Sequence, residues 1–166
     1  MIIRAAKISD LNAIKSLEDE CFAQNERVSK EAFREFLAKF CDDIFLACEN
    51  SELAGQIVTQ STAKRDFDDE MFAGVKFYDK NGEWLMITSL AVSAKFRGRG
   101  IAAALLKQAQ EHAKTLGKKG VVLTCNANLV KFYEKFGFTN EGICTSNFGG
   151  AKWHQMRWEI KGSNLD

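Results

Sequence analysis

The sequence predicts an α/β (α+β) fold in which a mixed sheet is packed between helices. Three observations lead to this prediction. A chain of 166 residues with 46% hydrophobic content suits one compact domain with a substantial core. Strand-like and helix-like patterns follow one another in the order β-α-α-β-β-β-α-β-α-β-β. An apolar run at 84–92 leads through a small basic loop into a helix. We therefore expect residues 1–166 to form a single domain.

The N-terminal half predicts three strands and two helices. Residues 2–5 read as a short strand, and Ser9 is a plausible cap for a helix whose apolar positions run from Leu11 to Cys21. Ser29 caps a second helix, which presents an apolar face as far as Phe40. Strands at 44–48 and 53–59 form a hairpin through Asn50 and Ser51, and residues 61–82 form a long connection.

The C-terminal half predicts the centre of the sheet and a closing hairpin. The apolar run 84–92 suits a central strand, and the helix 101–116 ends at Gly117. A buried strand at 121–125 leads to a short helix at 129–136, capped by Asn126 and Asn128 and ended by Gly137. Strands at 138–145 and 152–160 flank a turn at Gly149 and Gly150.

Composition excludes several classes of function. The formal net charge is +1, so bulk electrostatics predict neither nucleic acid nor a membrane surface as partner. The five cysteines are widely spaced, with no C-x-x-C and no nearby histidine pair, so we expect reduced, buried thiols and no metal site. Neither a signal sequence nor an apolar run of membrane-spanning length is visible, which predicts a cytoplasmic protein.

The loop at 97–102 carries the first chemical signal. Gly98 and Gly100 can adopt backbone angles that are closed to other residues, so successive N–H groups can point toward one centre at a helix N-terminus. Such a corner binds phosphate. The loop has neither the Gly-Lys-Ser/Thr of a nucleotide P-loop nor the G-x-G-x-x-G of a dinucleotide fold. Taken alone, the glycines and Arg97 and Arg99 also fit an ordinary solvated turn.

The pattern R-x-x-G-x-A at 97–102 resembles the coenzyme A pyrophosphate loop of the GNAT N-acetyltransferase superfamily. The stretch N-A-N-L-V-K-F-Y-E-K-F-G-F at 126–138 is similar to that superfamily's asparagine, tyrosine and Gly-Phe motif, and the two motifs stand in the right order. Within the superfamily, two longer stretches resemble the arylalkylamine N-acetyltransferases: L-A-V-S-A-K-F-R-G-R-G at 90–100 and L-T-C-N-A-N-L-V-K-F-Y-E-K-F-G-F at 123–138. The resemblance implies a mixed, mostly antiparallel sheet of about seven strands with helices on both faces.

The resemblance also implies acetyl-CoA as co-substrate and a set of coenzyme A contacts. The strand backbone at 90–92 would pair with the pantetheine arm, residues 97–102 would hold the pyrophosphate, Asn126 would hold the pantetheine, and Tyr133 would approach the sulfur. The implied cofactor-binding residues are Leu90, Ala91, Val92, Arg97, Gly98, Arg99, Gly100, Ile101, Ala102, Asn126 and Tyr133.

Acetyl transfer to an amine needs a base and a proton donor, because a primary amine with a pKa near 10.4 is almost entirely protonated at neutral pH. Tyr133 can protonate the leaving sulfur, although a tyrosine in such a helix is also a common core residue. Enzymes of the arylalkylamine group carry two histidines on the fourth strand, and Met86 and Thr88 stand at those positions here. We therefore expect deprotonation through ordered water, assisted by Thr88 and Glu83.

Acceptor-binding residues are expected in the long connection and the last strand. The acidic residues Asp68, Asp69 and Glu70 could attract a cationic amine, or they could simply form a solvated loop. His154 could line the acceptor pocket or pack against Trp153. The sequence thus predicts an N-acetyltransferase, a monomer or homodimer, that acts on a small arylalkylamine- or polyamine-like substrate by direct attack in a ternary complex. A protein or peptide N-acetyltransferase and a non-catalytic acyl-CoA sensor are the alternatives.

Overall fold

The structure of the protein is a computed structural model that describes residues 1–161. Within these residues, one seven-stranded sheet has the order β1-β2-β3-β4-β5-β7-β6. Neighbouring strands are antiparallel except β4 and β5, which are parallel. The mixed, mostly antiparallel sheet is therefore confirmed. The strands are β1 (Ile2–Ala5), β2 (Ile44–Glu49), β3 (Glu52–Thr62), β4 (Trp84–Val92), β5 (Gly120–Cys125), β6 (Thr139–Ile143) and β7 (His154–Glu159).

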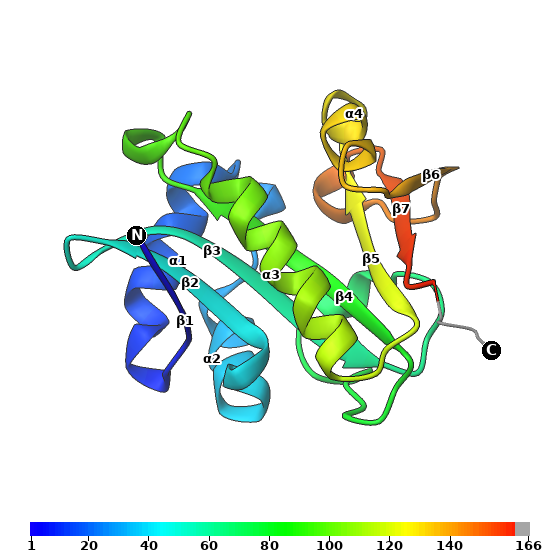
Figure 1. Cartoon of the computed structure of the whole chain (residues 1–166), viewed down its shortest axis with the longest axis horizontal. Helices are drawn as coiled ribbons and strands as arrows, with labels where there is room; N and C mark the ends of the chain where they lie inside the picture. Colours follow the sequence, from blue (N-terminus) through cyan, green and yellow to red (C-terminus); the bar gives the residue numbers. More distant parts are fainter. Residues whose placement is uncertain (162–166) are drawn as a thin grey trace.

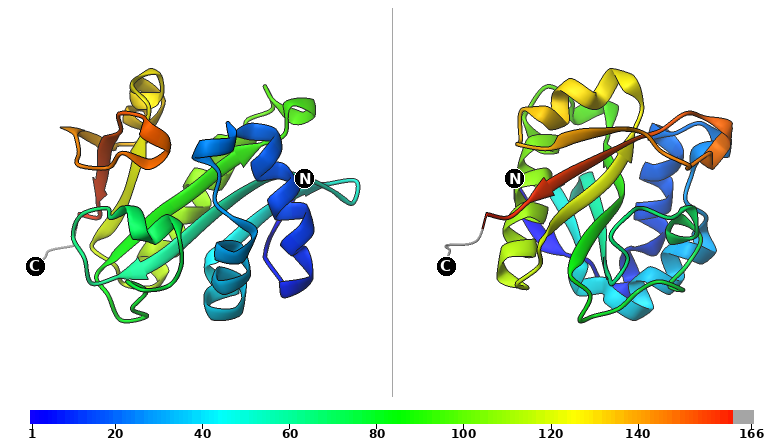
Figure 2. Two further views of the ribbon diagram at one scale, coloured as in Figure 1. Left: turned by 180° about the vertical axis from the view of Figure 1, so that it is seen from behind. Right: turned by 90° about the vertical axis from the view of Figure 1, so that its right-hand side faces the viewer.

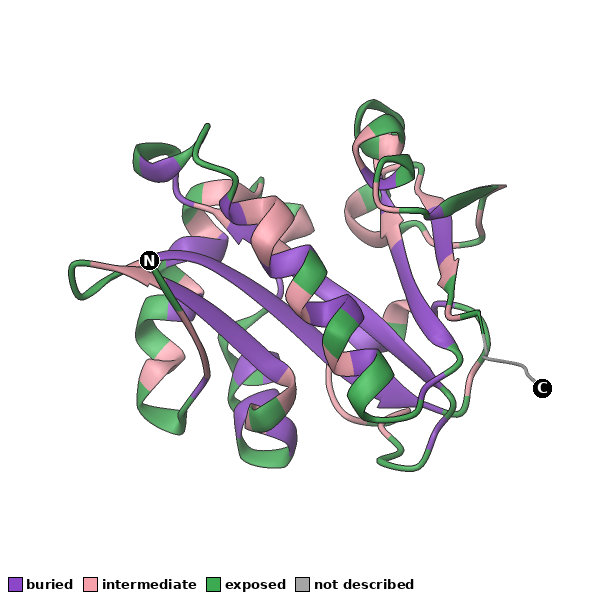
Figure 3. Cartoon of the chain, viewed as in Figure 1, coloured by how far each residue is buried: buried purple, intermediate pink, exposed green. Residues whose placement is uncertain are grey.

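Helices cover both faces of the sheet. In Figure 1, α3 (Ile101–Thr115) crosses in front of the strands, and α4 (Val130–Glu134) lies beyond the end of β5. The reverse view in Figure 2 brings α1 (Leu11–Cys21) and α2 (Lys30–Phe40) to the front. The central strands are buried between these layers, whereas the outer helix faces are exposed (Figure 3).

The two faces of β4 belong to two separate hydrophobic clusters. Trp84 and Met86 pack with the apolar side chains of α1 and α2, whereas Leu85 and Ile87 pack with α3 and Tyr133. This alternation is the period of two that a strand buried on both faces must show. The apolar run at 84–92 predicted such a strand, and β4 has those bounds.

Most predicted helix and hairpin signals are confirmed. Ser29 caps α2, with its hydroxyl oxygen accepting a hydrogen bond from the N–H of Ala32 at 3.0 Å. Asn50 and Ser51 both have positive φ, as a tight hairpin turn between β2 and β3 requires. Ser9 was a wrong prediction, since it lies inside a short 3-10 turn at Ile8–Asp10. α1 follows that turn and begins at Leu11.

The last hairpin differs most from its prediction. The strands β6 and β7 end at Ile143 and begin at His154, so residues 144–153 form a long connection rather than a tight turn at Gly149 and Gly150. The predicted helix at 129–136 is a 3-10 turn followed by the short α4.

The cysteines are all free thiols, as expected, but only Cys125 is buried. Among residues 1–161, none of the helices has the length and apolar character needed to cross a membrane.

Candidate active site

The site forms where the two parallel strands separate. β4 and β5 pair only at their beginnings, where Trp84, Leu85 and Met86 face the segment 120–122. Beyond Met86 the strands diverge, as Figure 1 shows, and this edge of β4 has no strand partner in the described part of the chain. The backbone of residues 87–92 is therefore available on that side for a ligand that binds like an added strand.

A cavity occupies the space between the diverging strands. Its walls come from α1, β4, β5 and α4, and its outer side comes from three connections. The lining residues are Glu18, Phe22, Glu26, Phe72, Ile87, Thr88, Ser89, Leu90, Leu123, Thr124, Cys125, Asn126, Leu129, Tyr133, Phe148 and Trp153. A second hollow continues along the end of β4 and is lined by Cys21, Phe22, Leu90, Ala91, Val92, Arg97, Ala102, Leu129, Phe132 and Tyr133. Tyr133 and Leu90 line both, so the two hollows meet there.

Thr88 forms a β-bulge in the wall of the cavity. On β3, Val58 is opposite Ser89 and Thr59 is opposite Ile87, so Thr88 is an extra residue on β4. A bulge shifts the alternation of side chains along a strand. Ser89 therefore faces α1, although in a regular strand it would share the face of Ile87 toward α3.

Ser89 reaches a buried carboxylate on α1. Its hydroxyl donates a hydrogen bond to Glu18 Oε1 at 2.7 Å, and the N–H of Val28 donates to Glu18 Oε2 at 2.9 Å. Glu18 is 1% exposed. Burial raises the pKa of Glu18 to about 7, although both hydrogen bonds act in the opposite direction. The cavity thus contains a carboxyl group that changes its charge near neutral pH.

Tyr133 is held in the opposite wall by α4. It is 6% exposed, its ring packs edge-on against Phe132 and Phe138, and it lines both hollows. Burial raises the pKa of its phenol far above the ordinary value, so the hydroxyl stays protonated and can donate a hydrogen bond into the cavity. Asn126 lies at the end of β5 on the same wall.

The loop at 97–102 is open, as a phosphate site must be. Gly98 and Gly100 have φ of +79° and +76°, and a side chain built at either would meet no atom within 4 Å. Gly100 directly precedes α3, so the free N–H groups of the first helical turn lie beside the loop. Arg97 Nε donates to the Val92 carbonyl at 3.2 Å, and the Arg99 guanidinium lies over the Phe96 ring. These residues fit a pyrophosphate group.

Three connections close the outer side of the cavity, and we call them the roof: residues 22–28, 66–72 and 146–153. Asn25 Nδ2 donates to the Gly149 carbonyl at 2.8 Å. Gly149 has φ of +67°, and a Cβ there would lie 2.6 Å from the Asn25 carbonyl, so the close approach requires glycine. Phe72 and Phe148 stack with ring centroids 4.2 Å apart, and Trp153 Nε1 donates to the Phe148 carbonyl.

The acidic residues of the long connection bind other parts of the protein. Asp68 pairs with Lys64 at 2.8 Å and Glu70 pairs with Lys76 at 2.8 Å. Asp69 accepts hydrogen bonds from the Ser146 hydroxyl and the Asn147 N–H. The contacts of Asp69 join two segments of the roof. From this segment the cavity is lined by Phe72, which ends the 3-10 turn that begins at Asp69, and not by the acidic residues themselves.

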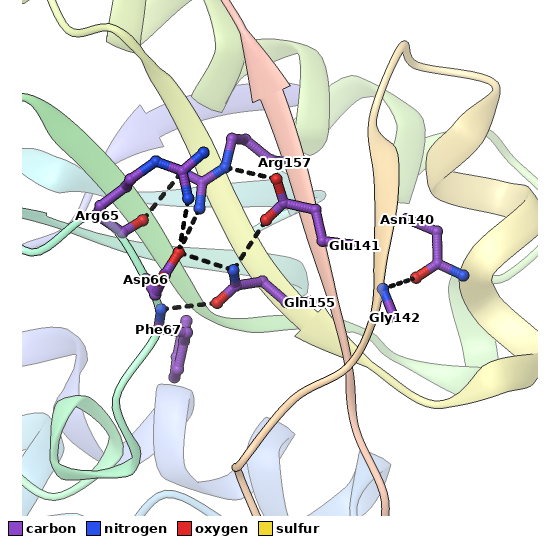
Figure 4. Close-up of polar contacts among 8 residues, drawn as sticks. All are labelled: Arg65, Asp66, Phe67, Asn140, Glu141, Gly142, Gln155 and Arg157. Atoms are coloured by element: carbon purple, nitrogen blue, oxygen red, sulfur yellow. Dashed lines mark hydrogen bonds and ion pairs between the residues drawn. The ribbon is translucent and has the colours of Figure 1, made fainter.

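A buried arginine anchors this connection to the last strands (Figure 4). The Arg157 side chain is 1% exposed and pairs with Asp66 at 2.6 Å and with Glu141 at 2.9 Å. Gln155 adds hydrogen bonds to the same two carboxylates and accepts one from the Phe67 N–H. These contacts fix the start of the connection that carries Phe72.

Two other predicted site residues lie apart from the cavity wall. Glu83 precedes β4, its side chain is 61% exposed, and it pairs with Lys119 at 3.1 Å. Five residues of extended chain, about 16 Å, separate it from Thr88. His154 begins β7, where its Nδ1 lies 3.3 Å from Asn140 Oδ1. The neighbouring Trp153 lines the cavity.

Sequence reasoning missed Glu18 and most of the roof. Glu18 lies on the apolar face of the helix predicted from Leu11 to Cys21, and a carboxylate at such a position was the available signal. The aromatic residues of the roof had no comparable pattern. In the described part of the chain, no group of three or more His, Cys, Asp or Glu side chains is arranged to hold a metal ion.

Comparisons with known proteins agree with this architecture. The sequence model of the acetyltransferase (GNAT) family matches residues 11–138. An acetyltransferase of Agrobacterium fabrum is 35% identical over 79 residues, which are 47% of this chain and 57% of that protein. The chain thus spans little more than half of that relative. The glucosamine 6-phosphate N-acetyltransferase of Arabidopsis thaliana is 25% identical over 114 residues, 69% of this chain and 71% of that one.

Among solved structures, the GphF GNAT-like decarboxylase in complex with isobutyryl-CoA has a TM-score of 0.83. It is 17% identical, and the match covers 97% of this chain and all of that chain. At this identity the likeness shows the fold alone.

Proposed function

The chain belongs to the acetyltransferase (GNAT) family, and we propose that it is an acetyl-CoA-dependent N-acetyltransferase whose acceptor is a small primary amine with an apolar or aromatic body. One observation carries the proposal. The unpaired edge of β4 leads from the open glycine loop to a roofed, aromatic cavity that contains Tyr133 and a carboxylate. We further propose that the predicted cofactor-binding residues hold coenzyme A along this edge.

The edge and loop can hold the pantetheine arm and the pyrophosphate of coenzyme A. Leu90, Ala91 and Val92, on the unpaired edge of β4, line the hollow where a pantetheine arm would extend, with Asn126 on the facing wall. The N–H groups at the start of α3 and the Arg97 guanidinium would bind the pyrophosphate. An acetyl group at the end of this arm would lie beside Tyr133, where both hollows meet.

The charge of the cavity supports a cationic acceptor. Two lining residues, Glu18 and Glu26, are carboxylates, and within residues 1–161 neither lysine nor arginine is among the lining side chains. A phosphorylated amino sugar, the substrate named for the Arabidopsis relative, would require positive groups at the phosphate. An ammonium group instead gains from carboxylates and from aromatic faces.

The roof supports a small acceptor over a polypeptide. A peptide needs an open groove from which its chain can continue, and here Asn25 and Gly149 join the first and third roof segments across that path. The rings of Phe22, Phe72, Phe148 and Trp153 favour an arylalkylamine over a polyamine, because a flat apolar ring fills such a space. We propose that Asp69 supports this acceptor site through its contacts with Ser146 and Asn147.

Thiol release from acetyl-CoA across a panel of amines tests this proposal. The panel contains 2-phenylethylamine, spermidine, glucosamine 6-phosphate and a short peptide with a free N-terminus, with acetylated products identified by mass spectrometry. We expect the highest kcat/KM for 2-phenylethylamine. A preference for the peptide or the sugar phosphate would contradict the acceptor class. Coenzyme A binding without thiol release for any amine would favour the non-catalytic sensor.

A further inference from the structure

Glu18 differs from the other carboxylates of the site in its setting. It is almost fully buried, both of its oxygens accept a hydrogen bond, and it belongs to the wall of the cavity that also contains Tyr133. A buried carboxylate is unfavourable for folding unless it is compensated, so such a group in a cavity is a candidate for function. The N-terminal helix would then supply a reactive group to a site otherwise built from β4, β5 and α4.

We propose that Glu18 is the general base that removes a proton from the acceptor amine, with Ser89 and the Val28 N–H holding its carboxylate in position. This inference rests on the proposed function and supplies the base that the fourth strand lacks, since Met86 and Thr88 cannot accept a proton at neutral pH. The bulge at Thr88 is part of the arrangement, because it turns Ser89 toward α1.

The reaction balances with these residues. Glu18 takes one proton from the ammonium group, and the neutral nitrogen attacks the thioester carbonyl carbon, forming the C–N bond. The C–S bond then breaks, and Tyr133 donates its phenolic proton to the departing sulfur. The second N–H proton returns to the phenolate through solvent, and Glu18 releases its proton to water. The products are the acetylated amine, the free thiol of coenzyme A and one proton.

Glu18 is the group expected to titrate near neutral pH in this cavity. Its own helix contributes Lys15 and Asp19, which lower and raise its pKa respectively. The roof contributes Glu26, and the facing walls contribute Cys125 and Tyr133. Burial raises the pKa of Cys125 to about 11 and that of Tyr133 further, so both stay protonated where Glu18 ionises. The acid limb of kcat/KM should therefore report Glu18.

The first test measures kcat/KM for 2-phenylethylamine against pH, together with kcat at saturation. In kcat/KM, which reports the free enzyme, the wild type should show an acid limb with its midpoint near pH 7. Glu18→Gln should lower kcat about 10²- to 10⁴-fold and remove this limb, while coenzyme A still raises the melting temperature. Glu35→Gln, an exposed carboxylate on α2, is the matched control and should leave the profile unchanged. Ser89→Ala should move the midpoint to higher pH, because the Ser89 hydroxyl lowers the pKa of Glu18.

A less basic acceptor separates proton removal from positioning. The β,β-difluoro analogue of 2-phenylethylamine is less basic, so a larger fraction of it is already neutral at pH 7 and needs no base. The fold-loss of kcat caused by Glu18→Gln should therefore be smaller with this analogue. An equal loss with both amines would overturn the proposal, because Glu18 would then act only in positioning. A retained acid limb in Glu18→Gln, or its removal in Glu83→Gln alone, would also overturn it.

Failure of this inference can be distinguished from failure of the proposed function. A wild type that releases no thiol with any amine contradicts the function. A wild type that is active while Glu18→Gln keeps its rate and its pH profile contradicts only the role of Glu18.

Discussion

The rings of Phe72 and Phe148 stack with centroids 4.2 Å apart and an angle of 19° between their planes. The two residues come from connections that are far apart in the chain, and both line the cavity. The stack joins the second and third segments of the roof. The roof is therefore a packed part of the protein that limits the size of the cavity.

Phe148→Ala should enlarge that space and weaken binding of an aromatic acceptor. We expect KM for 2-phenylethylamine to rise about tenfold, because loss of an aromatic contact of this kind costs about 1.4 kcal/mol. KM for acetyl-CoA should stay unchanged. Steady-state kinetics check this, with Ile143→Ala, an exposed apolar residue of neighbouring β6, as the control. Equal KM values for both variants would show that the stack does not contact the acceptor.

Glu18 should make stability depend on pH in an unusual direction. Its pKa is about 7 in the folded protein against an ordinary 4.5, so the folded state keeps a proton that the unfolded state loses. Glu18 therefore contributes fully to the free energy of unfolding below pH 4.5, and this contribution should fall by about 3 kcal/mol as the pH rises to 7. Denaturant unfolding measures this effect. The free energy of unfolding of Glu18→Gln, relative to that of the wild type, should increase as the pH rises from 4.5 to 7.

Carboxylates whose pKa is lowered in the folded protein, such as Glu141, act in the opposite direction, and their contributions cancel in that comparison. Burial raises the pKa of Glu141, but hydrogen bonds from Arg157 and Gln155 outweigh it and leave the pKa below its ordinary value. Its stabilising contribution is lost as the pH falls through that lowered pKa. A difference between wild type and Glu18→Gln that stays constant with pH would contradict a raised pKa for Glu18.

Gly100→Val should weaken coenzyme A binding while leaving the fold intact. A side chain at φ +76° is strained by about 1 to 3 kcal/mol, and it would also block approach of a pyrophosphate to the loop backbone. Gly117→Val is a matched control, since Gly117 has φ +72°, a Cβ there meets no atom within 4 Å, and it lies at the other end of α3.

Thermal unfolding with and without coenzyme A distinguishes the two glycine variants. Both should lose a similar amount of stability, but only Gly117→Val should keep the full increase in melting temperature on adding coenzyme A. An equal increase in both variants would remove the loop from the coenzyme A site.

Tyr133→Phe should lower kcat about 10²- to 10⁴-fold and leave coenzyme A affinity unchanged, because the ring still packs but no proton is delivered to the sulfur. The chain has one other tyrosine, Tyr78, which stacks on Phe40 away from the cavity. Tyr78→Phe is therefore the control, compared by thiol release at saturating acetyl-CoA. A fully active Tyr133→Phe would give Tyr133 a structural role only.

The order of elements could be predicted from the sequence because the spacing of apolar residues, the helix caps and the turns depend on residues close together in the chain. The run at 84–92, the cap Ser29 and the turn at Asn50 and Ser51 each act within a few residues. The glycine loop could be identified because its residues are adjacent in the chain, and the motif around Tyr133 was identified by its resemblance to the GNAT superfamily.

The relations that close the site could not be predicted in this way. Ser89 meets Glu18 across 71 positions, and only because a bulge at Thr88 interrupts the alternation of β4. The roof likewise depends on long-range contacts such as Asn25 with Gly149 and Asp66 with Arg157. The acidic run predicted charge at the acceptor site, but its carboxylates form ion pairs and hydrogen bonds within the protein.

The most direct test of the central claim is an initial-rate matrix of thiol release, with acetyl-CoA and 2-phenylethylamine both varied. Direct attack in a ternary complex predicts release that requires the amine, and double-reciprocal lines that intersect. The alternative is an acetylated cysteine, and Cys125 lines the cavity, but its raised pKa of about 11 leaves little thiolate to react. Parallel lines, together with loss of activity in Cys125→Ala, would contradict the account.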